Sequence, residues 1–238
     1  MNIALIGYGK MGKAIEEIAL QRNHRIVLKI DEHNLSDYTR EKMAGTEVAI
    51  EFTGPHSAYE NVRQALEWGI PVICGSTGWL ERLEEIKALC LQRKGAFLHT
   101  TNFSVGVNIF FEVNKRLAAL MASHSDYDVR ITEIHHTQKR DSPSGTAISL
   151  AEQVLASLGR KTRWVNHVSD NPEDLEIISE RVDPAPGTHR VRYASAIDDI
   201  EITHTAHSRK GFALGAVLAA EFIAGRQGVF TMQQVLGL

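Results

Sequence analysis

The segment from residue 133 to 147 brings together side chains that can move protons and hold an anion. It reads EIHHTQKRDSPSGTA, so His135 and His136 follow an expected strand and Lys139 comes shortly after them. Histidine titrates near neutral pH and can pass a proton, whereas lysine adds a full positive charge. The Ser-Gly-Thr run at 144–146 opens a helix, whose free backbone N–H groups and hydroxyls can bind a carboxylate or phosphate. We therefore expect one loop to combine an anion clamp with acid/base groups.

Simpler interpretations exist for the same residues. Neighbouring strand residues point to opposite faces, so His135 and His136 need not serve one site. A Ser-Gly-Thr start is often only a helix cap. A zinc site formed by His204 and His207 with one of the earlier histidines is the remaining alternative. Because a strand would point His204 and His207 to opposite faces, and no cysteine is near, we expect no metal.

A glycine-rich turn, GYGKMG at 7–12, lies between the first expected strand and the first expected helix. There the first glycine permits a tight turn, the second lets backbone approach a pyrophosphate, and the third allows close helix packing. An acid at the end of the second strand, here Asp31, would bind the adenosine ribose. The alternative is a tight turn in a domain that binds no nucleotide. The expected nucleotide contacts are Gly7, Gly9, Lys10, Met11, Gly12 and Asp31.

The residues after the second strand also bear on which nicotinamide cofactor is used. Asp31 is followed by Glu32, and two carboxylates repel the 2′-phosphate of NADPH. A pair of unit charges at 4 Å is worth up to about 4 kcal/mol at an effective dielectric of 20. We therefore expect NADH to be preferred. Lys10, Lys13 and Lys29 can offset the repulsion, so NADPH use stays possible.

Short apolar runs alternate with amphipathic stretches over the first hundred residues, which indicates a parallel sheet covered on both faces. The expected fold is α/β, with a Rossmann-like doubly wound parallel sheet in a dinucleotide-binding domain of residues 1–103 and 213–238. Its expected strands are 2–6, 25–30, 47–52, 70–74 and 96–98, and its expected helices are 11–22, 56–68 and 80–93.

The pattern then changes, which predicts a second α+β domain with a mixed sheet at 104–212, for substrate binding and oligomerisation. Residues 127–131 alternate strictly, as in a strand with one wet face. The last expected helix, 214–224, is apolar on most sides and is expected to pack on the first domain. The other expected elements are helices 107–121 and 146–158 and strands 176–179, 189–193 and 200–204.

Composition excludes several other classes of protein. The 238 residues are 43% hydrophobic and 23% charged, which excludes wholesale disorder. With 26 Lys plus Arg against 29 Asp plus Glu there is no basic field, so we expect no nucleic-acid partner. Cys74 and Cys90 form no disulfide framework, and no targeting segment is visible, so we expect a cytoplasmic protein. The apolar run 211–225 is too short for a bilayer and contains Glu221, so no membrane partner is expected.

The segment from 133 to 147 resembles the signature of the 4-hydroxy-tetrahydrodipicolinate reductase (dihydrodipicolinate reductase) family. That signature is E-x-H-H-x-x-K-x-D-x-P-S-G-T-A, and each fixed position is met here. The resemblance extends over almost the whole chain. The further matching segments are Glu51-Phe52-Thr53, Gly75-Ser76-Thr77-Gly78 with one Ser for Thr, Asn102-Phe103-Ser104-Val105-Gly106-Val107-Asn108, Ile200-Glu201-Ile202-Thr203-His204 and Ser208-Arg209.

The resemblance implies NAD(P)H-dependent reduction of 4-hydroxy-tetrahydrodipicolinate to tetrahydrodipicolinate in lysine and diaminopimelate biosynthesis. It implies that His135 is a proton donor and acceptor, that Lys139 is a proton donor, and that the protein is a homotetramer. The residues that would hold the dicarboxylate substrate are His136, Lys139, Ser144, Gly145 and Thr146. Those that would lie near the nicotinamide are Gly75, Ser76, Thr77, Thr100, Thr101, Asn102 and Phe103.

The chain departs from the family pattern at three places. The glycine turn is one residue tighter than the common version, Asp183 stands where a glycine is usual, and the segment from 158 to 176 is short. Two other functions fit the glycine turn. A nicotinamide-binding sensor would not need His135 and Lys139 beside an anion clamp. A dehydrogenase acting on an amino acid or aldehyde would lack the Pro-Ser-Gly-Thr helix start.

Overall fold

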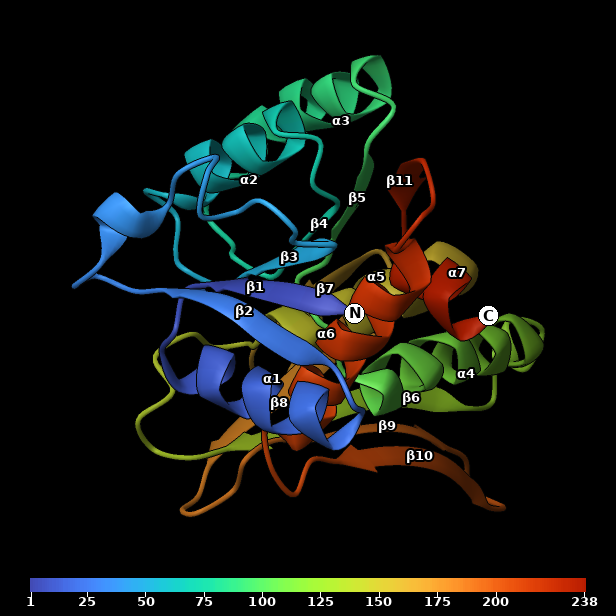
Figure 1. The fold of residues 1–238 in the computed structure, drawn as a ribbon. Coiled ribbons are helices and arrows are strands. Elements are labelled where there is room, and N and C mark those ends of the chain that lie inside the picture. Colours follow the sequence, from blue (N-terminus) through green and yellow to red (C-terminus); the bar gives the residue numbers. More distant parts are fainter. The chain divides into compact units, whose positions relative to one another are not determined.

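The computed structural model describes residues 1–238, which divide into two units. The first unit comprises residues 1–108 and 209–238, and the second comprises residues 109–208. The first contains a six-stranded sheet with the strand order β11-β5-β4-β3-β1-β2, and every neighbouring pair is parallel (Figure 1). The strands are β1 (Asn2–Ile6), β2 (Arg25–Ile30), β3 (Val48–Glu51), β4 (Val72–Cys74), β5 (Ala96–His99) and β11 (Gly228–Phe230).

Helices cover both faces of this sheet, as the alternation of strands and helices predicted. Successive residues of β1 point to opposite faces, so Ile3 and Leu5 belong to one buried cluster and Ala4 and Ile6 to another. The first cluster lies under α1 (Lys10–Gln21), α6 (Lys210–Ile223) and α7 (Met232–Leu236). The second lies under α2 (Ala58–Glu67) and α3 (Leu83–Gln92). The doubly wound Rossmann-like fold is therefore confirmed. Two short 3₁₀ helices, η1 (Leu35–Asp37) and η2 (Leu80–Arg82), lie in the connections.

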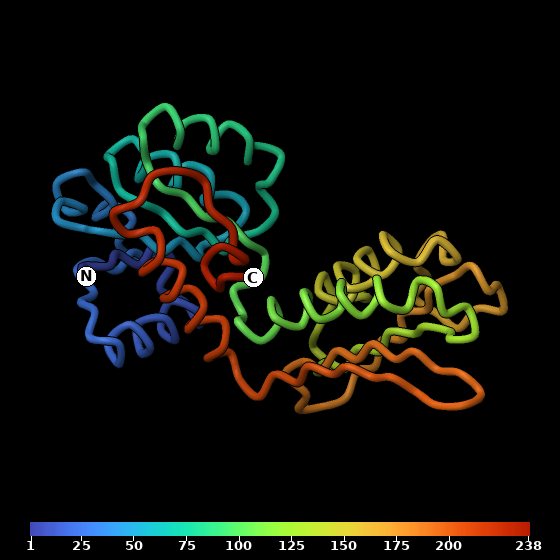
Figure 2. The backbone as a smooth tube through the Cα atoms, turned by 90° about the vertical axis from the view of Figure 1, so that its right-hand side faces the viewer, coloured from blue at the N-terminus to red at the C-terminus, as the bar shows by residue number.

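The C-terminal segment packs on the first hundred residues, in agreement with prediction. Figure 2 shows it in red beside the blue N-terminal elements, and α6 contacts α1 directly. Glu221 of α6 accepts hydrogen bonds from Arg22 at 2.7 and 2.8 Å. A Cβ at Gly215 would lie 1.7 Å from the carbonyl oxygen of Phe103, so only glycine allows this approach. The expectation that α6 is the last helix is wrong, because β11 and α7 follow it.

The second unit contains a mixed five-stranded sheet with the order β10-β9-β6-β8-β7, as predicted for this part of the chain. β6 is parallel to β8 and antiparallel to β9, which in turn is antiparallel to β10. Helices α4 (Val105–Met121) and α5 (Gly145–Ser157) pack on one face. The strands are β6 (Asp128–His135), β7 (Arg163–Val165), β8 (Asp174–Arg181), β9 (Thr188–Ala194) and β10 (Asp199–Thr205).

Strand β6 is longer than the alternation of residues 127–131 predicted. Its buried positions are Val129, Ile131, Glu133 and His135, so the face that is apolar at its start becomes acid and imidazole at its end. A strand keeps alternate side chains on one face regardless of their chemistry. The polar end of this buried face is where the candidate site lies. Among all helices of the chain, none is long and apolar enough to cross a membrane.

Candidate functional site

A row of four polar side chains crosses the covered face of the second sheet at its end. The strand register places Glu133 opposite His189 on one side and Ser179 on the other, and His204 lies opposite His189. The row next to it is purely apolar and contains Ile131 and its neighbours on β8, β9 and β10. The sheet therefore brings residues far apart in the sequence together beside the start of α5.

Glu133 is fully buried and holds this cluster together. Its carboxylate accepts the backbone N–H of Ser144 at 3.1 Å to each oxygen, and the hydroxyl of Ser179 at 2.8 Å. The guanidinium of Arg181 donates to it at 3.3 Å. Burial raises the pKa of Glu133, but the hydrogen bonds from Ser144 and Ser179 outweigh burial and leave this pKa below its usual value. The group is thus an anion at neutral pH.

His135 lies beside this anion on the same strand face and is 7% exposed. Its Nδ1 lies 3.4 Å from Oε2 of Glu133. Burial lowers the pKa of His135; the Glu133 charge opposes that change, while Lys139 and Arg181 add to it, and the net direction is downward. The imidazole is therefore neutral at neutral pH. His136 follows the strand and is half-buried.

Ser144 is the N-cap of α5 and is buried. Its hydroxyl accepts the N–H of Ala147 at 3.2 Å and lies 3.0 Å from Nε2 of His189. Burial lowers the pKa of His189 to about 4, so this second imidazole is also neutral. Of the other expected substrate contacts, Gly145 is exposed and Thr146 is half-buried, both in the first turn of α5.

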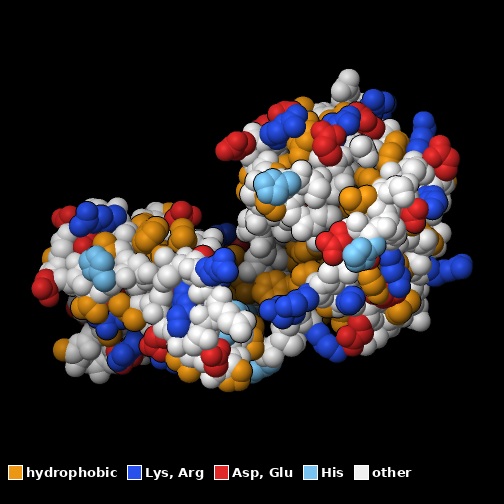
Figure 3. Space-filling view, turned by 90° about the vertical axis from the view of Figure 1, so that its left-hand side faces the viewer, with side chains coloured by type: hydrophobic (Ala, Val, Ile, Leu, Met, Phe, Trp, Pro, Cys, Tyr) orange, Lys and Arg blue, Asp and Glu red, His pale blue; other side chains and the backbone are white.

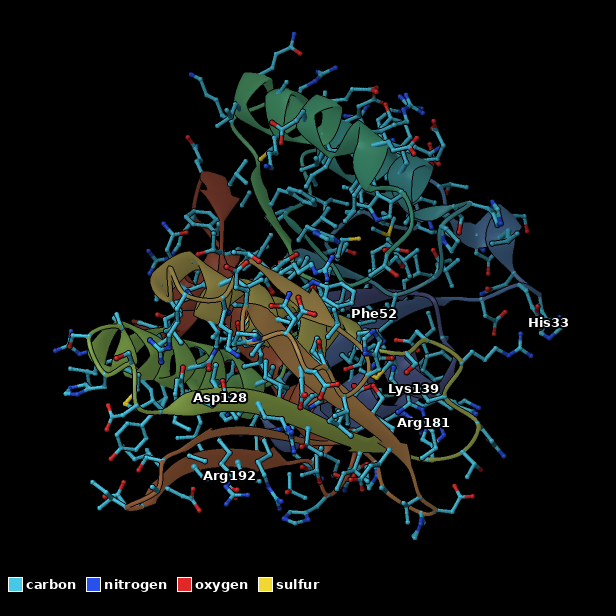
Figure 4. The ribbon with its side chains drawn as sticks, turned by 180° about the vertical axis from the view of Figure 1, so that it is seen from behind. His33, Phe52, Asp128, Lys139, Arg181 and Arg192 are labelled. Carbon is cyan, nitrogen blue, oxygen red and sulfur yellow. The ribbon has the colours of Figure 1, made fainter.

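Lys139 lies in the loop between β6 and α5, with its ammonium 2.8 Å from both carboxylate oxygens of Asp141. Arg181 donates to the backbone oxygen of Asp141 at 2.7 Å, which ties the loop to β8. Figure 4 shows Lys139 and Arg181 near one another, at the end of the sheet away from Asp128. The structure therefore gathers His135, Lys139 and the start of α5 at one end of the second unit.

Asp183, one of the departures from the family pattern, binds the same loop through Thr137. Its carboxylate accepts the backbone N–H of Thr137 at 3.1 Å and the Thr137 hydroxyl at 2.6 Å. These hydrogen bonds lower the pKa of Asp183. Thr137 lies between His136 and Lys139 in the chain, so the aspartate restrains the segment that carries both.

The residues that come close enough together to hold a metal ion differ from the histidine set considered from the sequence. Glu133, His135 and His189 place one potential ligand atom each within 4.8 Å of one another. Both oxygens of Glu133 already accept hydrogen bonds, and Nε2 of His189 lies against the hydroxyl of Ser144. The absence of a metal cofactor therefore stays our prediction.

In the first unit, the glycine turn lies at the carboxyl end of β1 and opens α1. A Cβ at Gly12 would lie 2.3 Å from the carbonyl oxygen of Gly7, so this pair needs glycine for packing. Gly9 is exposed, and a Cβ there would meet nothing within 4 Å. Gly9 is also the N-cap of α1, where no side chain caps the helix. The first turn of α1, with Lys10 and Met11, thus offers N–H groups to an anion, which fits a pyrophosphate.

The residues expected at the adenosine end lie on and after β2. Asp31 is half-buried, and its carboxylate accepts the backbone N–H of His33 at 2.8 Å. Lys29 pairs with Glu16 at 2.7 Å, and its ammonium lies 4.8 Å from the centre of the Tyr8 ring. Tyr8 in turn donates its hydroxyl hydrogen to Glu16. Of the three lysines expected to offset the acids, Lys29 is therefore already neutralised by a carboxylate.

Two loops expected near the nicotinamide follow the adjacent strands β4 and β5. A Cβ at Gly75 would lie 2.2 Å from the ring of Phe52, which also contacts the ring of Phe103 at 5.6 Å between centroids. The carbonyl oxygen of Ser76 accepts the indole N–H of Trp79 at 2.8 Å. Thr77 and Thr101 are exposed, Thr100 and Asn102 are half-buried, and the hydroxyl of Thr100 accepts the N–H of Asn102 at 3.2 Å.

Glu133, His189 and Arg181 were not among the site residues expected from the sequence. The alternation of β6 was the available signal for Glu133, because it places this residue on the face of the buried Ile131. His189 and Arg181 gave no such signal, since only the strand register brings them to Glu133.

A Rossmann-like unit with an open glycine turn, followed by a unit with acid/base groups and an anion-binding helix start, defines a nucleotide-dependent oxidoreductase. Comparison with known families then identifies which one. Residues 1–103 match the model of the dihydrodipicolinate reductase N-terminus, and residues 106–236 match that of its C-terminus. The chain belongs to the dihydrodipicolinate reductase family.

Relatives and solved structures agree with this assignment. The chain is 48% identical to the 4-hydroxy-tetrahydrodipicolinate reductase of Christiangramia forsetii, over 99% of this chain and 98% of that protein. It is 34% identical to that of Methanosarcina mazei, over 99% of this chain and 89% of that protein. The dipicolinate-bound dihydrodipicolinate reductase of Paenisporosarcina sp. TG-14 has the same fold, with a TM-score of 0.78, 20% identity and 98% coverage of both chains.

These findings confirm the predicted enzyme class and reaction: the chain is a pyridine-nucleotide-dependent reductase of the lysine and diaminopimelate route. They decide against a sensor without turnover and against a dehydrogenase for another substrate. A protein from gentamicin A biosynthesis in complex with NAD shares the fold at 13% identity and a TM-score of 0.62, which bears on architecture alone. Acidic and basic side chains are interspersed on the face shown in Figure 3.

Proposed function

We propose that the end of the second sheet binds the dicarboxylate substrate and handles its proton. The main support for this proposal is that His135, Lys139 and the start of α5 gather there around a buried anion, Glu133. The ammonium of Lys139 and the N–H groups of Gly145 and Thr146 would hold carboxylates, with His136 beside them. Ser144 would act as the cap that places these N–H groups, because its own hydroxyl is engaged by Ala147 and His189.

In this proposal, Lys139 donates the proton that the reduction requires. His135 acts as a proton donor and acceptor. NADH, when bound, would supply the hydride. The ammonium of Lys139 is held by Asp141 until a substrate carboxylate competes for it. His135 is neutral, so it suits proton acceptance and return rather than a lasting charge.

The nucleotide would lie along the glycine turn and the loops after β4 and β5. Gly7, Gly9, Lys10, Met11 and Gly12 would surround the pyrophosphate, since Gly9 leaves open space there. The nicotinamide would lie near Gly75, Ser76, Thr77, Thr100, Thr101, Asn102 and Phe103. Each group belongs to the carboxyl ends of parallel strands, where such folds bind ligands.

We further propose that NADH is preferred over NADPH. Asp31 and the exposed Glu32 follow β2, where the adenosine ribose and a 2′-phosphate would lie, and the nearby Lys29 is neutralised by Glu16. The test compares kcat/KM for the two cofactors, with freshly made synthase product as substrate and aspartate and simple aldehydes as controls. A higher kcat/KM with NADPH would overturn the preference.

We also propose that the protein is a homotetramer located in the cytoplasm. Both helices of the second unit pack on one face of its sheet. The other face carries exposed ion pairs such as Arg190 with Glu201 and Arg192 with Asp199, which a second copy can cover. Both cysteines are free and buried, which suits a reducing compartment. Light scattering after size exclusion measures the assembly, and a monomeric mass would contradict the tetramer.

A further inference from the structure

We infer that Glu133 is a positioning residue that fixes the tautomer of His135, with Nδ1 protonated and Nε2 left as the reactive nitrogen. The inference rests on the proposed role of His135 in proton exchange. Glu133 belongs to the signature segment, yet neither the anion clamp nor the proton transfer uses its carboxylate directly.

The two oxygens of Glu133 have different surroundings. Oε1 is saturated, because it accepts from the Ser179 hydroxyl at 2.8 Å, the Ser144 N–H at 3.1 Å and Arg181 at 3.3 Å. Oε2 shares the Ser144 N–H and otherwise faces two imidazoles, with Nδ1 of His135 at 3.4 Å and Nε2 of His189 at 3.8 Å. One oxygen therefore anchors the carboxylate, and the other is left for histidine.

Of the two histidines, His135 is the one that needs this oxygen. Nε2 of His189 already has the Ser144 hydroxyl at 3.0 Å. Nδ1 of His135 is buried and makes no hydrogen bond, and Oε2 of Glu133 lies 3.4 Å from it. A buried polar atom without a hydrogen bond is costly, and Oε2 of Glu133 accepts only. Nδ1 must therefore carry the hydrogen, and the 3.4 Å contact is of the kind that tightens when a substrate binds.

The surroundings of Nε2 fit the opposite role. This nitrogen lies beside Gly187, where a Cβ would approach it to 3.1 Å. Because residue 187 is glycine, it places no side chain of its own against Nε2. Because a neutral imidazole holds one hydrogen, protonation of Nδ1 leaves the lone pair on Nε2. The strand geometry thus orients His135 as carboxylate partners orient histidines in other active sites.

The experiment uses nitrogen-15 NMR of histidine-labelled full-length protein at neutral pH. In the parent protein, His135 is expected as the Nδ1–H tautomer. In Glu133→Gln, the amide can donate to Nδ1, so His135 should change to the Nε2–H tautomer. Glu176→Gln is the matched control, since Glu176 is a buried carboxylate on β8 that pairs with Arg130 instead. It should leave the His135 signals unchanged.

Kinetics of the same proteins give the second readout. Glu133→Gln should lower kcat about 10- to 100-fold, as loss of such a partner does elsewhere, and should leave the KM for NADH unchanged. Should Glu133→Gln fail to fold, the parent spectrum alone decides, because Nε2–H or a cationic His135 at neutral pH overturns the inference. Unchanged tautomer or unchanged kcat in a folded Glu133→Gln also overturns it. A full rate in His135→Gln would instead refute the proposed proton exchange, whatever the tautomer.

Discussion

Gly7 and Phe52 approach so closely that a Cβ on Gly7 would lie 2.3 Å from the carbonyl oxygen of Phe52. Gly7 also has a φ of +100°, which side chains rarely adopt. Gly7→Ala is therefore expected to lower the free energy of unfolding by about 2–4 kcal/mol, measured by urea denaturation.

Gly9→Ala is the matched variant, because a Cβ at Gly9 meets open space. It should change the free energy of unfolding by about 1 kcal/mol or less. The added methyl group would stand where backbone meets pyrophosphate, so the Kd for NADH should rise about tenfold or more, measured by calorimetry. Parental NADH affinity in Gly9→Ala would show that the cofactor binds elsewhere.

The contrast between these two glycines shows what a motif can and cannot predict. The spacing of Gly7, Gly9 and Gly12 predicted the turn and its place after β1, because few residue types other than glycine allow so tight a turn. Which glycine serves packing and which serves the ligand depends on what surrounds each one. For Gly7, that neighbour is Phe52, which the sheet register brings alongside and which no local pattern announces.

Glu133 marks a similar limit in the second unit. Alternation along residues 127–131 was enough to predict the strand, but the same alternation carries Glu133 and His135 onto the buried face. The apolar alternation ends at Ile131, because Glu133 and His135 are polar although they lie on the buried face. The expected strand therefore ended four residues early. Strands β7 and β11, of three residues each, were not predicted.

The pairing of Lys29 with Glu16 predicts how cofactor preference can be changed. Glu16→Gln removes the partner charge and frees the ammonium for a 2′-phosphate. An exposed ion pair is worth up to about 1 kcal/mol, so kcat/KM for NADPH should rise about fivefold with that for NADH little changed. Glu17→Gln, at the neighbouring helix position, is the control, because Glu17 pairs with Lys210 rather than Lys29. An equal gain in both variants would point to net charge alone.

Lys139 is expected to act both as a clamp and as an acid, and two substitutions separate these roles. Lys139→Ala removes both, so kcat should fall about 10²–10⁴-fold and the substrate KM should rise. Lys139→Arg keeps the positive charge but cannot give up a proton, so it should retain the KM and still lose kcat. Arg140→Ala, at the exposed neighbouring cation, should leave both unchanged. Near-parental kcat in Lys139→Arg would limit Lys139 to anion binding.

The buried His189 makes folding stability depend on pH. Its pKa is about 4 in the folded protein because of burial, against about 6.5 in an unfolded chain. Between these values the unfolded state binds a proton that the folded state does not, so stability falls as pH drops from about 6.5 to 4. The loss approaches about 3 kcal/mol for this group. The lowered pKa of Glu133 acts in the same direction, since its contribution is lost as pH falls through the folded pKa.

Urea denaturation at several pH values should therefore give a flatter profile for His189→Gln than for the parent, whereas His33→Gln, at an exposed side chain, should match the parent. Parallel profiles for His189→Gln and the parent would mean that His189 titrates normally in the folded protein.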